Sequence, residues 1–294
     1  ADSTASADPL TGQEQQYPGQ RPAAVVIDNA PGSTTQWGIG SASVVLEAAA
    51  RADTAPSLCL VYPSVSAMPT VGPVTLGQDL FWRLLSGQQV LPIQRGCDLY
   101  TRNFLDYWNL RAVDALETGR NAFTTGNTDW ASPLWCTNGQ SVAKVLGSLS
   151  LSSALSEDPA ESADSTQEGD TPAVPTVPAL LPQQTDGHLP DADVADAVQA
   201  AVQFPSGSTT RFAYDTDTGT YGMLHNDGTP QLDANTGAQA AFDNLLVLYS
   251  ASTPRDDGCT LDYDLTMGGG LWLNGGHLWH ITWTQGTGST FALS

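Results

Sequence analysis

An acidic segment without aromatic side chains divides this 294-residue chain. Residues 151–178 read LSSALSEDPAESADSTQEGDTPAVPTVP, which is rich in Ser, Thr, Pro and acidic residues. Such a composition buries too little apolar surface to offset the conformational entropy lost on ordering. The segment therefore predicts a linker or inserted loop that contains a domain boundary, and the chain is long enough for two domains.

The half before this segment combines apolar strands with helical patterns. Strands are expected where the chain reads RPAAVVIDNAPGS and SLCLVYPSV, because both are compact apolar runs that turn residues close. Apolar residues at helical spacing predict helices in IGSASVVLEAAARADTAP, TLGQDLFWRLLSG and TRNFLDYWNLRAVDALETG. Interleaved strands and helices predict an α/β-type domain over residues 21–150, with its strands covered by helices.

The half after the segment is dominated by β signals. A short helical stretch is expected in PDADVADAVQAAVQF, and then alternating residues in TTRFAYD and GTYGMLH predict a hairpin. FDNLLVLYS predicts a buried strand, and GGLWLNGGHLWHITW predicts two strands joined at Asn274-Gly275. Residues 179–294 thus predict an antiparallel β-rich domain, and the whole chain an α+β fold. Trp272, Trp279 and Trp283 are expected to be divided between the core and the open face of the sheet.

Charge and hydropathy limit the partners. The 31 acidic and 10 basic residues give a formal net charge of −21, so we expect no nucleic-acid partner. No apolar run is long enough to span a membrane. Residues 1–20 are small, polar and acidic, which predicts a tether left after an export signal or a lipid-modified cysteine was removed. Contact with the membrane is expected only through that removed anchor.

The four cysteines, Cys59, Cys97, Cys136 and Cys259, show no metal-binding spacing. An even count outside the cell permits two disulfides, in any of three pairings, and a Cys97–Cys136 bridge and four free thiols are equally favoured. Cys59 is expected to be buried in a strand.

Residues 214–237, YDTDTGTYGMLHNDGTPQLDANTG, raise the question of a calcium loop. The twelfth position counted from Asp215 is Asn226 rather than Glu, and both flanks alternate like strands. Tight turns are therefore favoured. His277 and His280 are expected on opposite faces of a strand, which prevents them from sharing a metal ion. We expect neither a metal site nor a cofactor.

No nucleophile elbow, zinc-protease pair or phosphate-binding loop is present. The best polar constellation is Asp28 and Asn29 after the first strand, with Glu47 on the expected helix, because open α/β sheets bind ligands beyond the carboxyl ends of their strands. Asp28 and Glu47 are the catalytic candidates. Asn29, with Tyr100, Thr101 and Arg102 of DLYTR, are the ligand-binding candidates. In a purely structural alternative, Asp28 and Asn29 cap a turn and Glu47 pairs with Arg51.

These blocks, in this order, resemble the YerB-like lipoproteins, a bacterial family whose domains have no assigned function. The resemblance is carried by PLTGQ, RPAAVVIDNAPGSTTQWGIGSASVVLEA, VGPV and DLYT, and then by FAYDTDTGTYGMLHNDGTPQLDANTG, NLLVLYS, GGGLWLNGG and HITW. It implies an exported, membrane-anchored protein with an α/β-type domain followed by a β-rich one. Basic residues that usually follow VGPV and the helix with Glu47 are absent here, where the chain reads TLGQDL and RADTAPSL.

The leading hypothesis is a non-catalytic extracytoplasmic binding or interaction module of the bacterial cell envelope, with a glycan, peptide or protein as its partner. One alternative is a hydrolase of envelope polymers that uses Asp28 and Glu47 as paired carboxylates. Another is a degenerate scaffold that has lost an ancestral site. The absence of catalytic motifs favours a protein that is not an enzyme.

Overall fold

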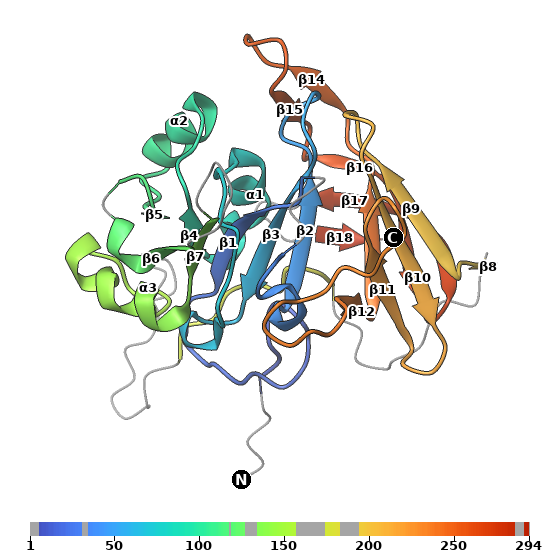
Figure 1. Cartoon of the computed structure of the whole chain (residues 1–294), viewed down its shortest axis with the longest axis horizontal. Helices are drawn as coiled ribbons and strands as arrows, with labels where there is room; N and C mark the ends of the chain where they lie inside the picture. Colours follow the sequence, from blue (N-terminus) through green and yellow to red (C-terminus); the bar gives the residue numbers. More distant parts are fainter. Residues whose placement is uncertain are drawn as a thin grey trace, which may run out of the picture.

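The structure is a computed structural model, and it describes residues 6–30, 35–117, 119–126, 134–156, 174–182, 194–285 and 291–293. Figure 1 shows an N-terminal domain, blue to green, beside a C-terminal domain, orange to red. The first contains a mixed sheet with helices, and the second consists of antiparallel sheets. The α+β fold expected from the sequence is confirmed.

Five strands form the N-terminal sheet, in the order β2-β3-β1-β4-β5. β3 runs antiparallel to β1 and β2, whereas β4 runs parallel to β1 and β5. Four of the strands therefore run in one direction, and their carboxyl ends lie along one edge. The bounds are Ala23–Asp28 (β1), Val44–Ala48 (β2), Ser57–Tyr62 (β3), Leu91–Gln94 (β4) and Val113–Asp114 (β5).

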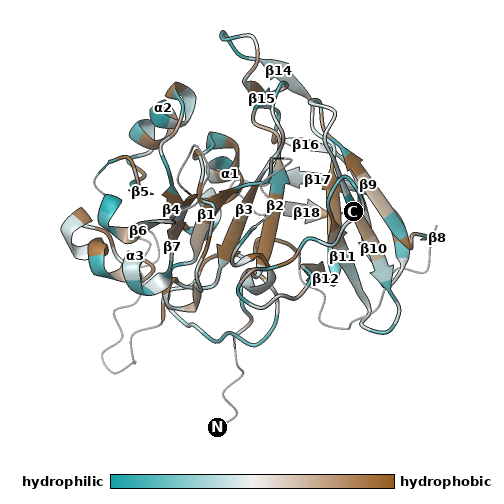
Figure 2. Ribbon diagram, in the orientation of Figure 1, coloured by the Kyte–Doolittle hydropathy of each residue, from teal (hydrophilic) through white to brown (hydrophobic). Residues whose placement is uncertain are grey.

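Alternating residues of these strands enter two separate cores. Val26 and Val61 face α1 (Asp79–Leu84) and α2 (Leu99–Tyr107). Val25 and Leu60 face the other side, where Val142 of α3 (Gly139–Leu146) packs. Figure 2 shows β1 to β4 in brown, because a sheet covered on both faces needs apolar residues at nearly every position. The remaining elements of this domain are β6 (Phe123–Gly126), β7 (Leu134–Thr137) and the 3-10 helices Ile39–Ser41, Val65–Ala67, Ser86–Gln88, Arg120–Ala122 and Gly147–Leu149.

Three helix predictions need correction. The helix expected over residues 39–56 is wrong, because Val44–Ala48 forms strand β2, with Val45 and Leu46 on opposite faces of the sheet. The helix expected over 101–119 ends at Tyr107, and the chain continues into β5. The helical stretch expected after residue 190 is instead β8 (Ala195–Asp196) and β9 (Gln199–Gln203). The helix expected in 75–87 is confirmed as the shorter α1.

Two antiparallel sheets form the C-terminal domain. One has the order β12-β11-β10-β9, and the other has the order β13-β16-β17-β18, with β8 added beside β17. Their facing residues, Tyr221, Leu245 and Leu273 among them, form a small core. The bounds are Thr209–Asp215 (β10), Thr220–Leu224 (β11), Ala241–Phe242 (β12), Asn244–Leu248 (β13), Met267–Asn274 (β16), His277–Gln285 (β17) and Phe291–Leu293 (β18).

Both expected hairpins are present. The β16–β17 turn is Gly275-Gly276 rather than Asn274-Gly275, since Asn274 pairs with His277 and both glycines have positive φ. The expected buried strand β13 is covered mainly at Leu245.

The expected division of the tryptophans is wrong. Trp272 pairs with Trp279 and Trp283 pairs with Gly268, so the register places all three rings on one face of the sheet. Trp279 and Trp283 are buried, and Trp272 is half-buried. A side chain at Gly268 would collide with the Trp283 ring, because its Cβ would lie 2.7 Å from Nε1. Glycine at this position is thus explained by close packing.

The C-terminal domain covers the edge of the N-terminal sheet formed by β2. Met223 and Ala240 enter the core on one face of that sheet, and Trp283 enters the core on the other. A hairpin of β14 (Ser252–Pro254) and β15 (Leu261–Tyr263) continues the contact, with Leu261 N donating to Ala50 O at 2.8 Å. The two domains therefore share both large cores.

The segments expected as tether and linker are partly ordered. Leu10 is buried, and Leu180 N donates to Pro9 O at 2.8 Å. Leu155 N donates to Gly19 O at 2.9 Å. Residues 6–20 therefore pack against the folded chain rather than forming a free tether, while 1–5 and 157–173 lie outside the described residues.

All four cysteines are free thiols, and Cys59 is buried as expected. None of the helices in the described ranges is long and apolar enough to cross a membrane.

We predict that the ion pair between Asp79 and Arg255 stabilises the contact between the domains. Arg255 Nη2 lies 2.6 Å from Asp79 Oδ2, and both side chains are nearly buried. Asp79→Asn removes the charge that compensates Arg255. Urea unfolding should therefore show that the free energy of unfolding falls by about 2 kcal/mol. Asp53→Asn, which breaks the exposed pair with Arg51, is the matched control and should barely move the midpoint. Equal effects of the two substitutions would contradict this role.

Candidate functional site

Polar residues gather at the carboxyl edge of the N-terminal sheet. Asn29 follows β1, Glu47 lies near the end of β2, and Gln94 and Asp114 end β4 and β5. Because these four strands run in one direction, their polar ends share one edge, which is where open α/β sheets bind ligands.

The chain itself divides this edge. After its pairing with Ile93, β1 separates from β4, and residues 73–77 enter between them. Asp28 N donates to Pro73 O at 2.9 Å on one side, and Arg95 N donates to Thr75 O at 2.9 Å on the other. The inserted segment fills the space beside the end of β1, where the sequence analysis predicted a ligand site at Asp28. What remains is a closed half at Asn29 and Glu47 and an open half at Gln94 and Asp114.

Glu47 is the centre of the closed half. Its Oε1 accepts hydrogen bonds from Asn29 Nδ2 at 2.8 Å and from Thr210 Oγ1 of β10 at 2.6 Å. Asn29 Oδ1 in turn accepts from Gln36 Nε2 at 3.0 Å and from Gln231 Nε2 at 3.3 Å. Thr210 and Gln231 belong to the C-terminal domain. The network therefore joins the two domains, and Asn29 and Glu47 lie together as expected from the sequence.

The protonation of Glu47 depends on its enclosure. Burial raises its pKa from the ordinary value of 4.5 to about 7, although the hydrogen bonds from Thr210 and Asn29 act in the opposite direction. Both donors approach the same oxygen, so either the acid or the carboxylate can accept them. The acid form of Glu47 therefore persists to a higher pH than that of an exposed glutamate.

Asp28 does not share this environment. Glu47 and Ile27 both pair with Leu58 of β3, whereas Asp28 and Ala48 both pair with Ser57. Directly paired residues share a face of the sheet, so Asp28 and Glu47 lie on opposite faces. Asp28 Oδ1 accepts from Ala30 N at 2.9 Å, as a turn cap does. The expected pairing of Glu47 with Arg51 is wrong, because Arg51 contacts Asp53 and Asp257 instead.

The acidic turns of the C-terminal domain hold the chain in shape. Asp215 Oδ1 accepts from Asp217 N at 2.9 Å, and Asp227 Oδ1 accepts from Thr229 N at 2.9 Å, which confirms the turn interpretation. Asp233 has a longer-range role that the sequence did not indicate. Its carboxylate accepts from Gly38 N at 3.1 Å and Gly40 N at 2.9 Å, and so fixes the turn to the N-terminal domain.

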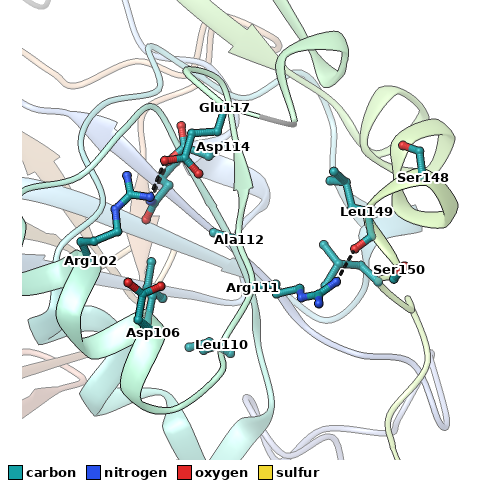
Figure 3. A pocket seen from close by; sticks show the side chains of 13 residues that line it. Arg102, Asp106, Leu110, Arg111, Ala112, Asp114, Glu117, Ser148, Leu149 and Ser150 are labelled. Carbon is teal, nitrogen blue, oxygen red and sulfur yellow. Dashed lines mark hydrogen bonds and ion pairs between the residues drawn. The ribbon is translucent and has the colours of Figure 1, made fainter.

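The open half contains a cavity of about 380 Å³. It lies between α2, the ends of β4 and β5, and the turn after α3 (Figure 3). This volume is within the range of small-molecule sites in proteins. Its lining mixes leucines with charged side chains of both signs, namely Gln94, Arg102, Leu105, Asp106, Leu110, Arg111, Ala112, Asp114, Glu117, Ser148, Leu149, Ser150 and Leu151.

Some of the charges in the cavity are already paired, and others are not. Asp114 accepts from Gln94 Nε2 at 2.8 Å and from Gly96 N at 2.7 Å, so it is held rigidly at the end of β5. Figure 3 shows Arg102 joined to Glu117, and Arg111 directed toward Leu149, whose carbonyl accepts from it at 3.2 Å. Among the described residues, Asp106 and Arg111 have no partner of opposite charge.

The candidates from DLYTR have separate positions. Thr101 is buried, and its Oγ1 accepts from Asp79 N at 2.9 Å, which joins α2 to α1. The Tyr100 ring lies 4.7 Å from the guanidinium carbon of Arg255, at the contact between the domains. Only Arg102 reaches the cavity, and none of the three joins Asn29. Three residues of the cavity were not identified from the sequence, namely Asp106, Arg111 and Asp114. Asp114 could have been found, because it follows two apolar residues at the end of a strand, as Asp28 does.

The prediction that His277 and His280 lie on opposite faces of a strand is confirmed. The register of β16 and β17 places His277 with Asn274 and His280 with Leu271, on opposite faces of the sheet. Within the described ranges, no group of three or more His, Cys, Asp or Glu side chains is arranged to hold a metal ion.

We predict that Glu47→Gln alters the pH dependence of stability. An acid whose pKa is raised in the folded state stabilises it most below pH 4.5 and loses that contribution as the pH rises through about 7. The amide stays neutral at every pH. Between pH 4.5 and 8 the free energy of unfolding of the variant should therefore rise, relative to that of the wild type, by on the order of 3 kcal/mol. Urea unfolding at several pH values measures this gain. Glu117→Gln is the exposed control, and a gain that does not change with pH would refute the prediction.

Comparison with known proteins identifies relatives over nearly the whole chain. Residues 10–151 match the family model described as "Protein of unknown function (DUF3048) N-terminal domain", and residues 200–293 match the corresponding C-terminal domain. "Putative lipoprotein YerB" of Bacillus subtilis is 27% identical over 287 residues, which are 95% of this chain and 78% of that protein.

The fold is also similar to a solved structure. The crystal structure of YerB protein from Bacillus subtilis superposes with a TM-score of 0.78 at 20% identity, covering 98% of this chain and 90% of the other. The matches include both halves of the chain, in the order in which the sequence blocks occur. The chain therefore belongs to the DUF3048 family of proteins of unknown function, and it contains the N-terminal and the C-terminal domain of that family.

Proposed function

We propose that the protein is a non-catalytic binding module of the bacterial cell envelope, and that its ligand occupies the cavity beside α2. The observation that carries this proposal is the cavity itself, open at the carboxyl ends of β4 and β5. Loops at that edge of parallel strands are the usual place for ligands in sheets of this kind. The extracytoplasmic location is part of the proposal and is supported by homology to a protein named a putative lipoprotein.

The charges of the cavity favour a zwitterionic ligand. Arg111 offers a cation to a carboxylate, and Asp106 offers an anion to an ammonium group. Leu105, Leu110 and Leu149 provide apolar surface between them. Short peptides carry both charges at their ends. We therefore propose a short peptide of the envelope, such as a wall-peptide fragment, as the ligand class.

The geometry gives less support to hydrolysis by paired carboxylates. Glu47 has a pKa of about 7, which suits a general acid. However, its oxygen is held by Asn29 and Thr210, and Asp28 lies on the other face of the sheet. A glycosidase needs both carboxylates on one cleft. We therefore propose a structural role for Glu47.

We predict that short wall peptides with free amino and carboxyl ends bind saturably in calorimetric titration. Asp106→Asn and Arg111→Gln should each weaken binding about tenfold, because each removes one charge-assisted contact. Arg211→Gln on β10 removes an exposed arginine far from the cavity lining and is the matched control.

Peptides blocked at either end should bind as weakly to the wild type as the free peptide does to the corresponding variant. Binding that survives both substitutions, or no saturable binding by any peptide of this class, would contradict the proposal.

A further inference from the structure

Two arginines from separate segments converge on Trp135 of β7. The guanidinium carbon of Arg120 lies 4.2 Å from the centre of a Trp135 ring, and that of Arg95 lies 6.0 Å from it. A cation over the face of an indole is favourable. Two cations at one ring also repel each other, so the arrangement costs electrostatic energy unless an anion is present.

Among the residues that the structure describes, neither arginine has a carboxylate partner. Within the described ranges, Arg120 donates to the carbonyl of Phe123, at 3.3 Å, and the Nε of Arg95 is buried without a hydrogen-bond partner. By contrast, Arg51, Arg83, Arg102 and Arg255 each form ion pairs. In a chain with 31 acidic and 10 basic residues, two neighbouring arginines without a carboxylate are unexpected. A buried N–H that lacks an acceptor is rare, and at this atom it leaves the Arg95 guanidinium without a protein oxygen to neutralise its charge.

The position of these residues also favours a ligand. Arg95 directly follows β4, and Arg120 lies in the 3-10 helix Arg120–Ala122, shortly after β5. Both are therefore at the carboxyl edge of the parallel strands and beside Trp135 of β7. Figure 1 shows β6 and β7 next to β4 and β5. Gln94 and Asp114 line the cavity beside α2, and strand alternation turns Arg95 to the other face. The arginines thus lie outside the cavity already described.

We propose that Arg95, Arg120 and Trp135 form a binding site for a small phosphate-bearing ligand. Guanidinium groups match the geometry of phosphate oxygens, and two of them suit a dianion better than a single carboxylate. The net charge of −21 repels long polyanions at a distance, which favours a small ligand over a polymer. This site does not depend on peptide binding in the cavity.

Calorimetric titration of the full chain with inorganic phosphate, at low and constant ionic strength, tests the proposal. We expect saturable binding that Arg120→Gln weakens about tenfold and that Arg95→Gln with Arg120→Gln abolishes. Arg120 is exposed, so its replacement leaves the fold intact and decides the outcome even if the double variant unfolds. Arg211→Gln on β10 is the charge-matched control and should bind phosphate as the wild type does.

Two further probes define the ligand class. Acetate should bind more weakly than phosphate, and poly(glycerol phosphate) should bind no more tightly per phosphate group than inorganic phosphate does. The proposal is overturned if phosphate does not saturate, if Arg211→Gln weakens binding as much as Arg120→Gln does, or if acetate or the polymer is preferred.

Discussion

The covering of the β2 edge by the C-terminal domain is the constraint on which the rest of the structure depends. An exposed edge strand offers unpaired backbone groups to other chains, and proteins usually protect such edges. Here the two C-terminal sheets contribute to the cores on both faces of the N-terminal sheet, through Met223 on one side and Trp283 on the other. The two halves named separately in the family models are therefore joined by shared hydrophobic cores.

This covering determines which part of the carboxyl edge remains open. Thr210 and Gln231 approach Asn29 and Glu47 from the C-terminal domain, and together they close the half of the edge next to β2. Residues 73–77 fill the crevice between β1 and β4. The far half, beyond β4 and β5, is the more open one. It carries the cavity on one face of the sheet and the two arginines beside Trp135 on the other.

The sequence predicted the class of each domain, because strand-forming runs such as 23–28 and the alternating hairpin 209–224 are locally clear. It failed at β2. Val44, Val45, Leu46, Ala48 and Ala49 fit both a helix and a strand covered on both faces, and only pairing with β3 decides between them. The same ambiguity misassigned β9, where tertiary pairing with β10 overrides the helix propensity of its alanines.

The candidate site was predictable only in part. Asn29 and Glu47 do lie together, although Glu47 belongs to a strand rather than to the expected helix. The insertion of residues 73–77 has no local signal, since nothing in VGPVTLG shows which strands it will separate. Arg95, Arg120 and Trp135 carry no shared motif either. Their proximity results from the parallel pairing of β4 with β5 and from the hairpin of β6 with β7.

The division of the carboxyl edge into a closed and an open half is the central claim, and carbodiimide labelling of the native protein tests it most directly. Peptide mass spectrometry should find Asp106 and Glu117 modified early, because both are exposed, and Glu47 modified much more slowly, because it is only partly accessible and its Oε1 accepts two hydrogen bonds. Modification of Glu47 as fast as that of Asp106 would show that the edge next to β2 is open, and would contradict this account.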